Sequence, residues 1–204
     1  MGQARGVRTP QQERSRATQA RLLEATVECL AERGWAGTTT TVVAERAGVS
    51  RGAQLHHYPT KAALVTAAVA HLAERRAAEL RAEAQALPAG SARRLDHVVE
   101  MLAAAFTGPL FAAALELWVA ARTDPELRSA LVPLEARLGR EMYRLTVELL
   151  GADEHRPGVR EAVQLTLDLL RGLGVANLLS DDSTRREALL ASWKNHLRTV
   201  LDRE

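Results

Sequence analysis

The segment GVSRGAQLHHYPTK, residues 48–61, fits two different folds. Gly48, Ser50 and Gly52 match the G-x-S-x-G pattern of a hydrolase nucleophile elbow, in which Ser50 would be the catalytic serine. The same residues also fit the turn and second helix of a helix-turn-helix, in which Ser50 would cap that helix. The residues around the segment decide between an enzyme and a DNA-binding protein.

The residues before this segment predict helices. Residues 22–29 place apolar and small side chains at helical spacing, and Gly34 ends this helix in a backbone conformation that glycine readily adopts. The threonines at 38–41 provide an N-cap for a short second helix that ends at about Ala47. A nucleophile elbow requires a strand before its serine, because the strained turn lifts the hydroxyl above a sheet. We therefore interpret Ser50 as a helix cap and expect no enzyme.

The rest of the chain is predicted to be helical as well. Pro59 stops the third helix, and Thr60 caps a fourth helix that ends before Pro88. Five more helices are expected over about residues 91–108, 109–123, 124–150, 159–180 and 181–201. The sequence has no alternation of apolar and polar residues typical of strands. The predicted fold is all-α, with about nine helices.

The composition is that of an ordinary globular protein. The 204 residues are 47% hydrophobic and 25% charged. No apolar run approaches the roughly 20 residues that span a bilayer, and the polar first residues do not form a signal peptide. The single cysteine, Cys29, excludes an internal disulfide and suits a reducing compartment. These features predict a cytoplasmic protein without a membrane partner.

Positive charge is concentrated near the N-terminus. Residues 1–61 carry nine Arg or Lys and five Asp or Glu, a net charge of +4, whereas the remainder carries 18 and 20, a net charge of −2. A basic N-terminal third suggests a polyanion as partner at that end. A random fluctuation explains a charge of this size equally well, so charge alone leaves DNA binding open.

The segment from about Arg16 to Leu72 resembles the DNA-binding region of the TetR family of one-component transcriptional regulators. The resemblance rests on the first-helix pattern, the Gly34-aromatic step, the run Ala47-Gly48-Val49-Ser50, the His56-His57-aromatic run and Lys61. It implies a flexible basic arm at 1–15, a helix-turn-helix DNA-binding domain at 16–61, and a ligand-binding and dimerisation domain at 62–204. It implies no cofactor.

The resemblance also implies which side chains contact DNA. The residues implied in base contacts are Arg51, Gly52, Ala53, His56 and, in a supporting role, Thr41. The residues implied in phosphate contacts are Thr39, Thr40, His57 and Lys61. Ser50 caps the recognition helix within this surface, and Tyr58 takes the family's buried aromatic position.

Gln54 and Leu55 complete the predicted DNA-binding surface but depart from the family pattern. Gln54 stands where the family usually has a core leucine, and it is expected to reach either DNA or a neighbouring backbone group. Leu55 stands where the family usually has a phosphate-binding tyrosine, so a phosphate contact from this position is not implied. His56 and His57 point about 100° apart on a helix, so no metal site is expected.

The penultimate predicted helix is apolar on two faces, which indicates burial on two sides. One stripe contains Val163, Leu167, Leu170, Gly174 and Leu178, and the other contains Leu165, Leu169, Leu173 and Ala176. Together with the last helix it is expected to form a four-helix interface in a twofold homodimer, and internal packing alone is the alternative. The predicted interface comprises Val163, Leu167, Leu170, Gly174, Leu178, Leu189, Trp193 and Leu197.

The resemblance further implies a small-molecule pocket among the central helices. The predicted ligand-binding residues are Met101, Phe106, Phe111, Leu115, Trp118, Arg122, Tyr143 and Arg171. Each of these side chains also suits the core or the solvent. A mainly apolar lining suits a lipophilic effector.

These observations predict a homodimeric transcriptional regulator. It is expected to be a repressor that binds a palindromic operator in double-stranded DNA and is released by an apolar small molecule. The alternative is an all-helical ligand-binding or interaction protein that has lost DNA binding, and only Gln54 and Leu55 favour it.

Overall fold

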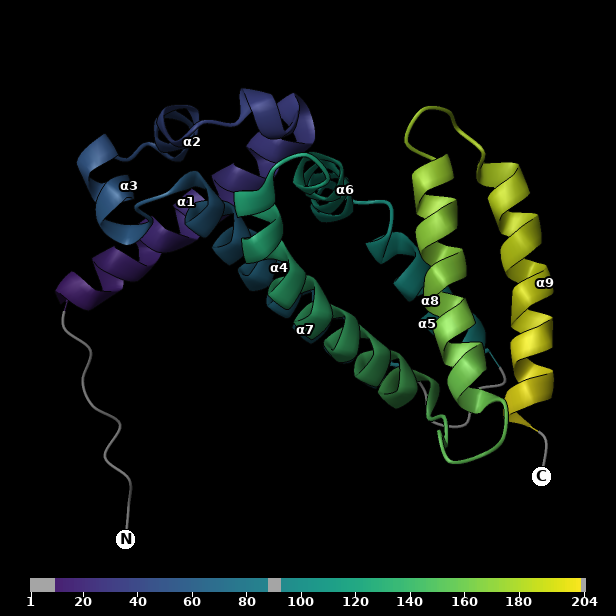
Figure 1. Ribbon diagram of the computed structural model, residues 1–204. Helices are drawn as coiled ribbons and strands as arrows, with labels where there is room; N and C mark the ends of the chain where they lie inside the picture. The colour runs from purple at the N-terminus through teal and green to yellow at the C-terminus, as the bar shows by residue number, and fades with distance from the viewer. Residues whose placement is uncertain (1–9, 88–92, 203–204) are drawn as a thin grey trace, which may run out of the picture. The chain divides into compact units, whose positions relative to one another are not determined.

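The computed structural model of the protein describes residues 10–87 and 93–202. Within these ranges all regular secondary structure is helical, which confirms the all-α prediction (Figure 1). The helices are α1 (Pro10–Gly37), α2 (Thr40–Ala47), α3 (Arg51–His57), α4 (Lys61–Gln85), α5 (Arg94–Ala105), α6 (Pro109–Ala121), α7 (Pro125–Leu150), α8 (Val159–Ala176) and α9 (Ser183–Leu201). No single helix in the described part is long and apolar enough to cross a bilayer, whereas α5 and α6 taken together reach that length and composition across the break between them.

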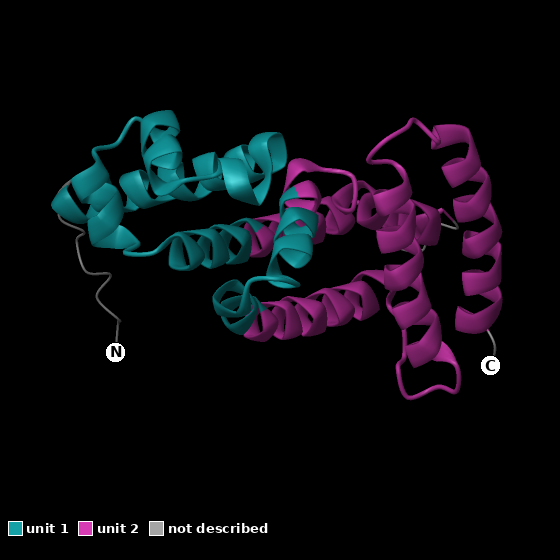
Figure 2. Ribbon diagram, turned by 45° about the horizontal axis from the view of Figure 1, so that its top comes forward, with its two compact units in different colours: residues 1–72, 113–131 teal, residues 73–112, 132–204 magenta. Residues whose placement is uncertain are grey.

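The helices divide into two compact units (Figure 2). Unit 1 comprises residues 1–72 and 113–131, and unit 2 comprises residues 73–112 and 132–204. Unit 1 thus contains the first part of α4 and most of α6, which the sequence assigned to the second domain. Two contacts tie these elements to α1: the ammonium of Lys61 donates to the Trp35 carbonyl, and the backbone N–H of Trp35 donates to Glu116.

The first helix of unit 1 begins earlier than expected. α1 starts at Pro10, so residues 10–15 of the predicted arm are helical. Proline suits the first helical position because its fixed φ is helical and its missing N–H would have no partner there. Residues 1–9 of the predicted arm lie outside the described residues.

The turn after the first long stretch of α1 is made by Gly34. Its backbone has φ 64° and ψ −176°, and this interrupts the helix, which resumes as far as Gly37. A Cβ atom at Gly34 would lie 2.7 Å from the Glu116 carboxylate, and L-residues rarely adopt this φ. Glycine is therefore favoured here by its conformation, and a larger residue would also have to displace the end of the Glu116 side chain.

Three predicted N-caps are confirmed by short side-chain hydrogen bonds. Thr39 Oγ1 accepts from the backbone N–H of Val42 at 3.2 Å, and Ser50 Oγ accepts from that of Ala53 at 3.2 Å. Thr60 Oγ1 accepts from the third residue after it at 3.0 Å. Each bond satisfies an N–H that has no partner inside its helix, so α2, α3 and α4 begin where the sequence predicted.

Unit 2 is built around α5, α8 and α9, which pack against one another in pairs. Gly174 of α8 lies against the backbone of Phe106 and the ring of Phe111, which leaves no room for a Cβ atom. The indole N–H of Trp193 donates to Thr166 Oγ1 at 2.9 Å and joins α9 to α8. The interior of this unit is therefore held by close apolar packing with a few polar links.

Candidate nucleic-acid interface

The second and third helices form a helix-turn-helix around Gly48. This residue has φ 63° and ψ 39°, the left-handed conformation that glycine adopts without strain. Its backbone N–H bonds to the Glu45 carbonyl at 3.1 Å, and the N–H of Val49 bonds to the Ala44 carbonyl at 3.0 Å. The carbonyls at the end of α2 are thereby satisfied, and the chain turns sharply into α3.

One face of α3 is turned outward. Arg51, Gly52, Leu55 and His56 are exposed, while Ala53 and His57 are half-buried. No heavy atom lies within 4 Å of the place where a Cβ of Gly52 would be. The fold itself does not require glycine at this position, so the missing side chain leaves open space for an external partner.

Gln54 does not belong to this outward face, and its prediction as a DNA-contacting residue is wrong. Its side chain is 0% exposed, and its amide Nε2 donates to the Tyr58 carbonyl at 2.7 Å. The other expectation, a bond to a neighbouring backbone group, is confirmed. The sequence left both open because a glutamine between apolar positions suits either side of a helix. The amide oxygen Oε1 is also buried and has no hydrogen-bond partner among the described residues.

Tyr58 follows directly as the C-cap of α3. Its backbone is extended, and its N–H bonds to the Gln54 carbonyl at 2.8 Å. The side chain, placed by the family resemblance in a buried aromatic position, is half-buried, and this burial raises the pKa of its phenol. Tyr58 therefore lies at the edge of the core, where it terminates the recognition helix.

Lys61 makes its main contact inside unit 1. Its Nζ lies 3.6 Å from the centroid of the Trp35 ring and donates to the carbonyl of the same residue. Burial lowers the pKa of the Lys61 ammonium, and nearby Asp124 opposes that shift. The phosphate contact expected from Lys61 stays a prediction. An ammonium has three N–H donors, so the bond to Trp35 leaves others available.

The remaining predicted contact residues lie around these helices. Thr39 uses its hydroxyl to cap α2, Thr40 is half-buried and Thr41 is exposed. The rings of His56 and His57 lie 5.4 Å apart at 63°. The described residues contain no group of three or more His, Cys, Asp or Glu that would hold a metal ion.

Arg46 fixes α2 against α1, which the sequence analysis missed. Its guanidinium pairs with Glu28 at 3.3 Å and makes two hydrogen bonds to Glu32. Those bonds hold the pKa of the Glu32 carboxyl below its usual range. The signal in the sequence is that Glu28 and Glu32 are spaced i, i+4 and so share one face of α1. Together with a basic residue in the last turn of α2, this pattern could have predicted the ion pairs of Arg46.

All eight predicted dimer-interface residues belong to unit 2, and most of them are buried within it. Five of the eight are buried in its own core, and their assignment to an interface is wrong: Val163, Leu167, Leu170, Gly174 and Leu197. Leu178 and Leu189 are exposed, and Trp193 is half-buried. Of the α8 stripe assigned to the interface, all members except Leu178 face this chain's core, and Gly174 lies against Phe106 and Phe111.

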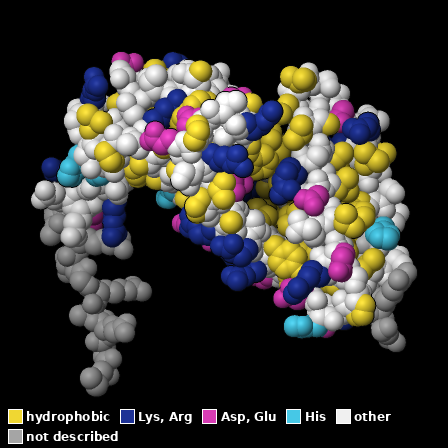
Figure 3. Space-filling model, viewed as in Figure 1, with side chains coloured by type: hydrophobic (Ala, Val, Ile, Leu, Met, Phe, Trp, Pro, Cys, Tyr) yellow, Lys and Arg dark blue, Asp and Glu magenta, His cyan; other side chains and the backbone are white. Residues whose placement is uncertain are grey.

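The other stripe is divided between the surface and the core. Leu165 is 54% exposed and Ala176 is exposed, whereas Leu169 is half-buried and Leu173 is buried. Two further apolar side chains are exposed: Val175 of α8, and Leu179 just beyond the helix, which is 98% exposed. Leu189 of α9 adds a further exposed leucine. Figure 3 shows hydrophobic side chains at the surface over α8 and α9. We refer to Leu165, Val175, Leu179 and Leu189 as the α8–α9 surface.

The predicted ligand residues fall into both units. Met101, Phe106, Phe111, Tyr143 and Arg171 belong to unit 2, and Leu115, Trp118 and Arg122 belong to unit 1. Within unit 2 the rings of Phe106 and Phe111 meet edge to face at 5.4 Å, and the Arg171 guanidinium lies 6.0 Å from the Phe106 ring. These three are the predicted ligand residues that the structure brings together.

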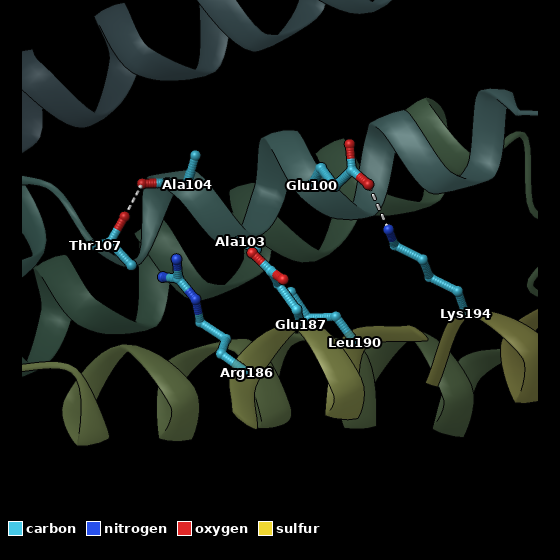
Figure 4. Close-up of a pocket in the computed structure, with 8 residues that line it drawn as sticks. All are labelled: Glu100, Ala103, Ala104, Thr107, Arg186, Glu187, Leu190 and Lys194. Carbon is cyan, nitrogen blue, oxygen red and sulfur yellow. Dashed lines mark hydrogen bonds and ion pairs between the residues drawn. The ribbon is translucent and has the colours of Figure 1, made fainter. Parts of the chain in front are cut away.

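The described residues of unit 2 enclose hollows at the surface. One, of about 430 Å³, lies between α5 and α9 (Figure 4) and is lined by Glu100, Ala103, Ala104, Thr107, Arg186, Glu187, Leu190 and Lys194. Another, of about 290 Å³, is lined by Gly139, Arg140, Tyr143, Arg144, Glu154 and Gln164. Of the predicted ligand residues, only Tyr143 lines either hollow, and its hydroxyl donates to Glu154 at 3.0 Å.

Comparison with known proteins identifies the helix-turn-helix. Residues 22–68 match the family of bacterial regulatory proteins of the tetR type. The chain is 33% identical to the HTH-type transcriptional regulator CymR of Pseudomonas putida over 193 residues, 88% of this chain and 89% of that protein. It is 31% identical to an uncharacterised HTH-type regulator of Mycobacterium bovis over 150 residues, 70% of this chain and 73% of the relative.

The fold also matches solved structures along most of its length. A crystal structure from Pseudomonas aeruginosa PAO1, of a protein assigned as a transcriptional regulator, has a TM-score of 0.70 and 25% identity and covers 94% of this chain and 93% of that one. A TetR-family member from Streptomyces coelicolor A3 has a TM-score of 0.60 at 22% identity, over 86% of this chain and 97% of that one. The chain belongs to the TetR family and is a DNA-binding transcriptional regulator.

Proposed function

We propose that this regulator is a homodimeric repressor that binds a palindromic operator and is released by an apolar small molecule. The observation that carries the proposal is the outward face of α3. Ser50 caps this helix, and the side chains of Arg51 and His56 are exposed on it. The missing side chain of Gly52 leaves open space beside the α3 backbone, where a partner could approach. This is the surface that a recognition helix presents to the major groove.

Each exposed group on α3 suits a particular part of DNA. The Arg51 guanidinium has the fork of donors that matches O6 and N7 of guanine. Gly52 permits the backbone to approach the base edges closely. His56 lies one turn after Gly52 and reaches a neighbouring base. Thr40, His57 and Lys61 would contact phosphates and fix the position of α3 in the groove.

The α8–α9 surface supports dimerisation. Its three leucines and its valine are exposed on α8, just beyond the end of α8, and on α9, and large exposed apolar side chains gathered in one region are typical of an interaction site. Two copies related by a twofold axis would bury it in a four-helix interface. A twofold dimer presents two copies of α3, which fit successive major grooves about 34 Å apart on a palindrome.

The effector is proposed to bind unit 2 beside Phe106 and Phe111. Both rings are buried, and the Arg171 guanidinium lies next to them. Aromatic side chains with one adjacent cation suit an apolar ligand that carries a polar or anionic end. A ligand that binds better to one spacing of the two recognition helices would shift the population toward it and lower operator affinity.

The test is DNA binding by the purified protein across a salt series. The probe is the DNA upstream of its own gene, compared with scrambled DNA of the same length. We expect selective binding whose affinity falls steeply with salt, because bound phosphates release counterions. Arg51→Ala should cost about 1–3 kcal/mol of discrimination on the preferred site.

The matched control is Arg128→Ala, which removes an exposed arginine of α7. It should leave selectivity unchanged. Equal affinity for upstream and scrambled DNA would not by itself contradict the proposal, because the operator can lie elsewhere. Selection from a randomised DNA pool settles that case. If no sequence is enriched, the protein is not an operator-binding repressor.

A further inference from the structure

Leu55 is an apolar side chain in the middle of a polar recognition surface. It is 42% exposed, and no other large hydrophobic side chain in residues 10–61 is exposed to this degree. Its neighbours on the outward face are Arg51, Gly52 and His56. A leucine that keeps 42% of its surface exposed leaves apolar area in water, so the position is suited to an external apolar group.

The direction of Leu55 is fixed by the residue before it. Gln54 is 0% exposed, and this burial holds the rotation of α3 about its own axis, while its amide bonds to the carbonyl of Tyr58 at the end of the same helix. The next residue on a helix points about 100° further round, which brings Leu55 to the outside. Arg51 lies one turn earlier on the same face, since residues i and i+4 are neighbours.

We propose that Leu55 is a specificity-determining residue that contacts the C5-methyl group of a pyrimidine in the major groove. The inference rests on the proposed placement of α3 in that groove. Among unmodified base pairs, the methyl of thymine is the apolar group that the major groove presents, and leucine is its chemical complement. The same methyl occurs on 5-methylcytosine. Because Arg51 suits guanine, each half-site should contain a methylated pyrimidine close to a guanine.

The experiment removes the methyl without changing any hydrogen-bonding group. The preferred site is first selected from randomised DNA with the purified full-length protein. Each thymine of the selected site is then replaced by deoxyuridine, one symmetric pair at a time. We expect one pair at which affinity falls about fourfold per half-site, the effect of one methyl-sized group leaving an apolar contact.

A variant of the protein tests whether Leu55 is the side chain that contacts this methyl group. Leu55→Ala should lose a similar factor on the unmodified site and become insensitive to deoxyuridine at that pair. Val119→Ala is the control, because it truncates an exposed side chain of α6 that is 65% exposed. It should retain both the affinity and the deoxyuridine effect. Melting curves of both variants should match the wild type, since neither side chain is buried.

Replacement of the same thymine by cytosine and by 5-methylcytosine distinguishes the two sources of the methyl. Recovery with 5-methylcytosine shows that a methyl on either base suffices, and no recovery assigns the contact to thymine. A deoxyuridine series that leaves the wild-type affinity unchanged at every position overturns the inference. In that case a loss of selectivity in Arg51→Ala would still support the proposed function, so the two failures are separable.

Discussion

The ammonium of Lys61, at the start of α4, lies 3.6 Å from the centroid of the Trp35 ring and donates to the Trp35 carbonyl. Trp35 follows the Gly34 turn of α1, and its backbone N–H donates to Glu116 of α6 at 3.4 Å. One residue thus receives contacts from two other helices of unit 1. A lysine in the family's phosphate-contact position is here also part of the packing of the domain.

Lys61→Met should destabilise the protein by about 1–3 kcal/mol. The substitution keeps most of the apolar stem but removes the cation over the indole ring and the donor to the Trp35 carbonyl. Urea unfolding measures the change, and Lys61→Arg should retain most of the stability. If Lys61 also contacts a phosphate, Lys61→Met reduces the salt slope of DNA binding by about one. An unchanged slope with lowered stability would limit Lys61 to packing.

Gly174→Ala and Gly172→Ala should have opposite effects although both lie in α8. A Cβ at Gly174 would clash with the Phe106 carbonyl and lie 2.8 Å from the Phe111 ring, and overpacking of this kind costs about 1–3 kcal/mol. No heavy atom lies within 4 Å of a Cβ at Gly172, where alanine should stabilise the helix by up to about 1 kcal/mol. Thermal melts of the two variants make the comparison. Equal shifts would show that α5 does not pack closely on Gly174.

Leu165→Glu should dissociate the proposed homodimer. The substitution places a charge on the α8–α9 surface, where association would bury it without a partner. Val132→Glu is the matched control, because Val132 of α7 is 56% exposed and Leu165 is 54% exposed. Sedimentation velocity should show a monomer for the first variant and a dimer for the second. A dimer in both variants would place the interface elsewhere.

Gly52→Ala should weaken DNA binding without destabilising the fold. The space around Gly52 is open, so an alanine meets no atom of the chain and favours the helix. In the major groove, however, the added methyl would separate the α3 backbone from the base edges. Affinity for the selected site and the melting temperature are measured on the same sample. Undiminished affinity would show that α3 does not approach the bases closely at Gly52.

The bond between Arg46 and Glu32 should make the stability of the protein fall more steeply in acid than it would without the bond. Arg46 lowers the folded-state pKa of Glu32 below its ordinary value of 4.5. A carboxylate with a lowered pKa contributes stability above its unfolded pKa, and that contribution is lost as pH falls through the folded pKa. Glu32→Gln should therefore reduce stability at neutral pH and flatten its decline in acid. Urea unfolding at several pH values down to about 3 measures both effects.

Glu141→Gln is the control for that series. Glu141 is an exposed glutamate of α7 for which the described residues include no ion-pair partner. Its substitution should leave the pH profile unchanged. The same flattening in both variants would mean that general charge, and not the contact with Arg46, governs the acid response.

The sequence by itself determined the helical character of the chain and the starting points of α2, α3 and α4. Thr39, Ser50 and Thr60 cap their helices through bonds to a residue three positions later, and Gly48 turns the chain through its own backbone conformation. Such interactions are complete within a few residues, so their physics is visible in a short segment. The family resemblance of residues 16–72 rested on the same local features.

Only the tertiary structure decided which way side chains face when two directions were open. Gln54 points into the core and Leu55 points out, although the sequence allowed the reverse for Gln54. On α8, Leu167 and Gly174 face this chain's core, whereas Leu165 remains exposed. A helix that is apolar on both sides fits its neighbours in either rotation. Its orientation is therefore set by packing between residues distant in the sequence, as where Phe106, the C-cap of α5, meets Gly174.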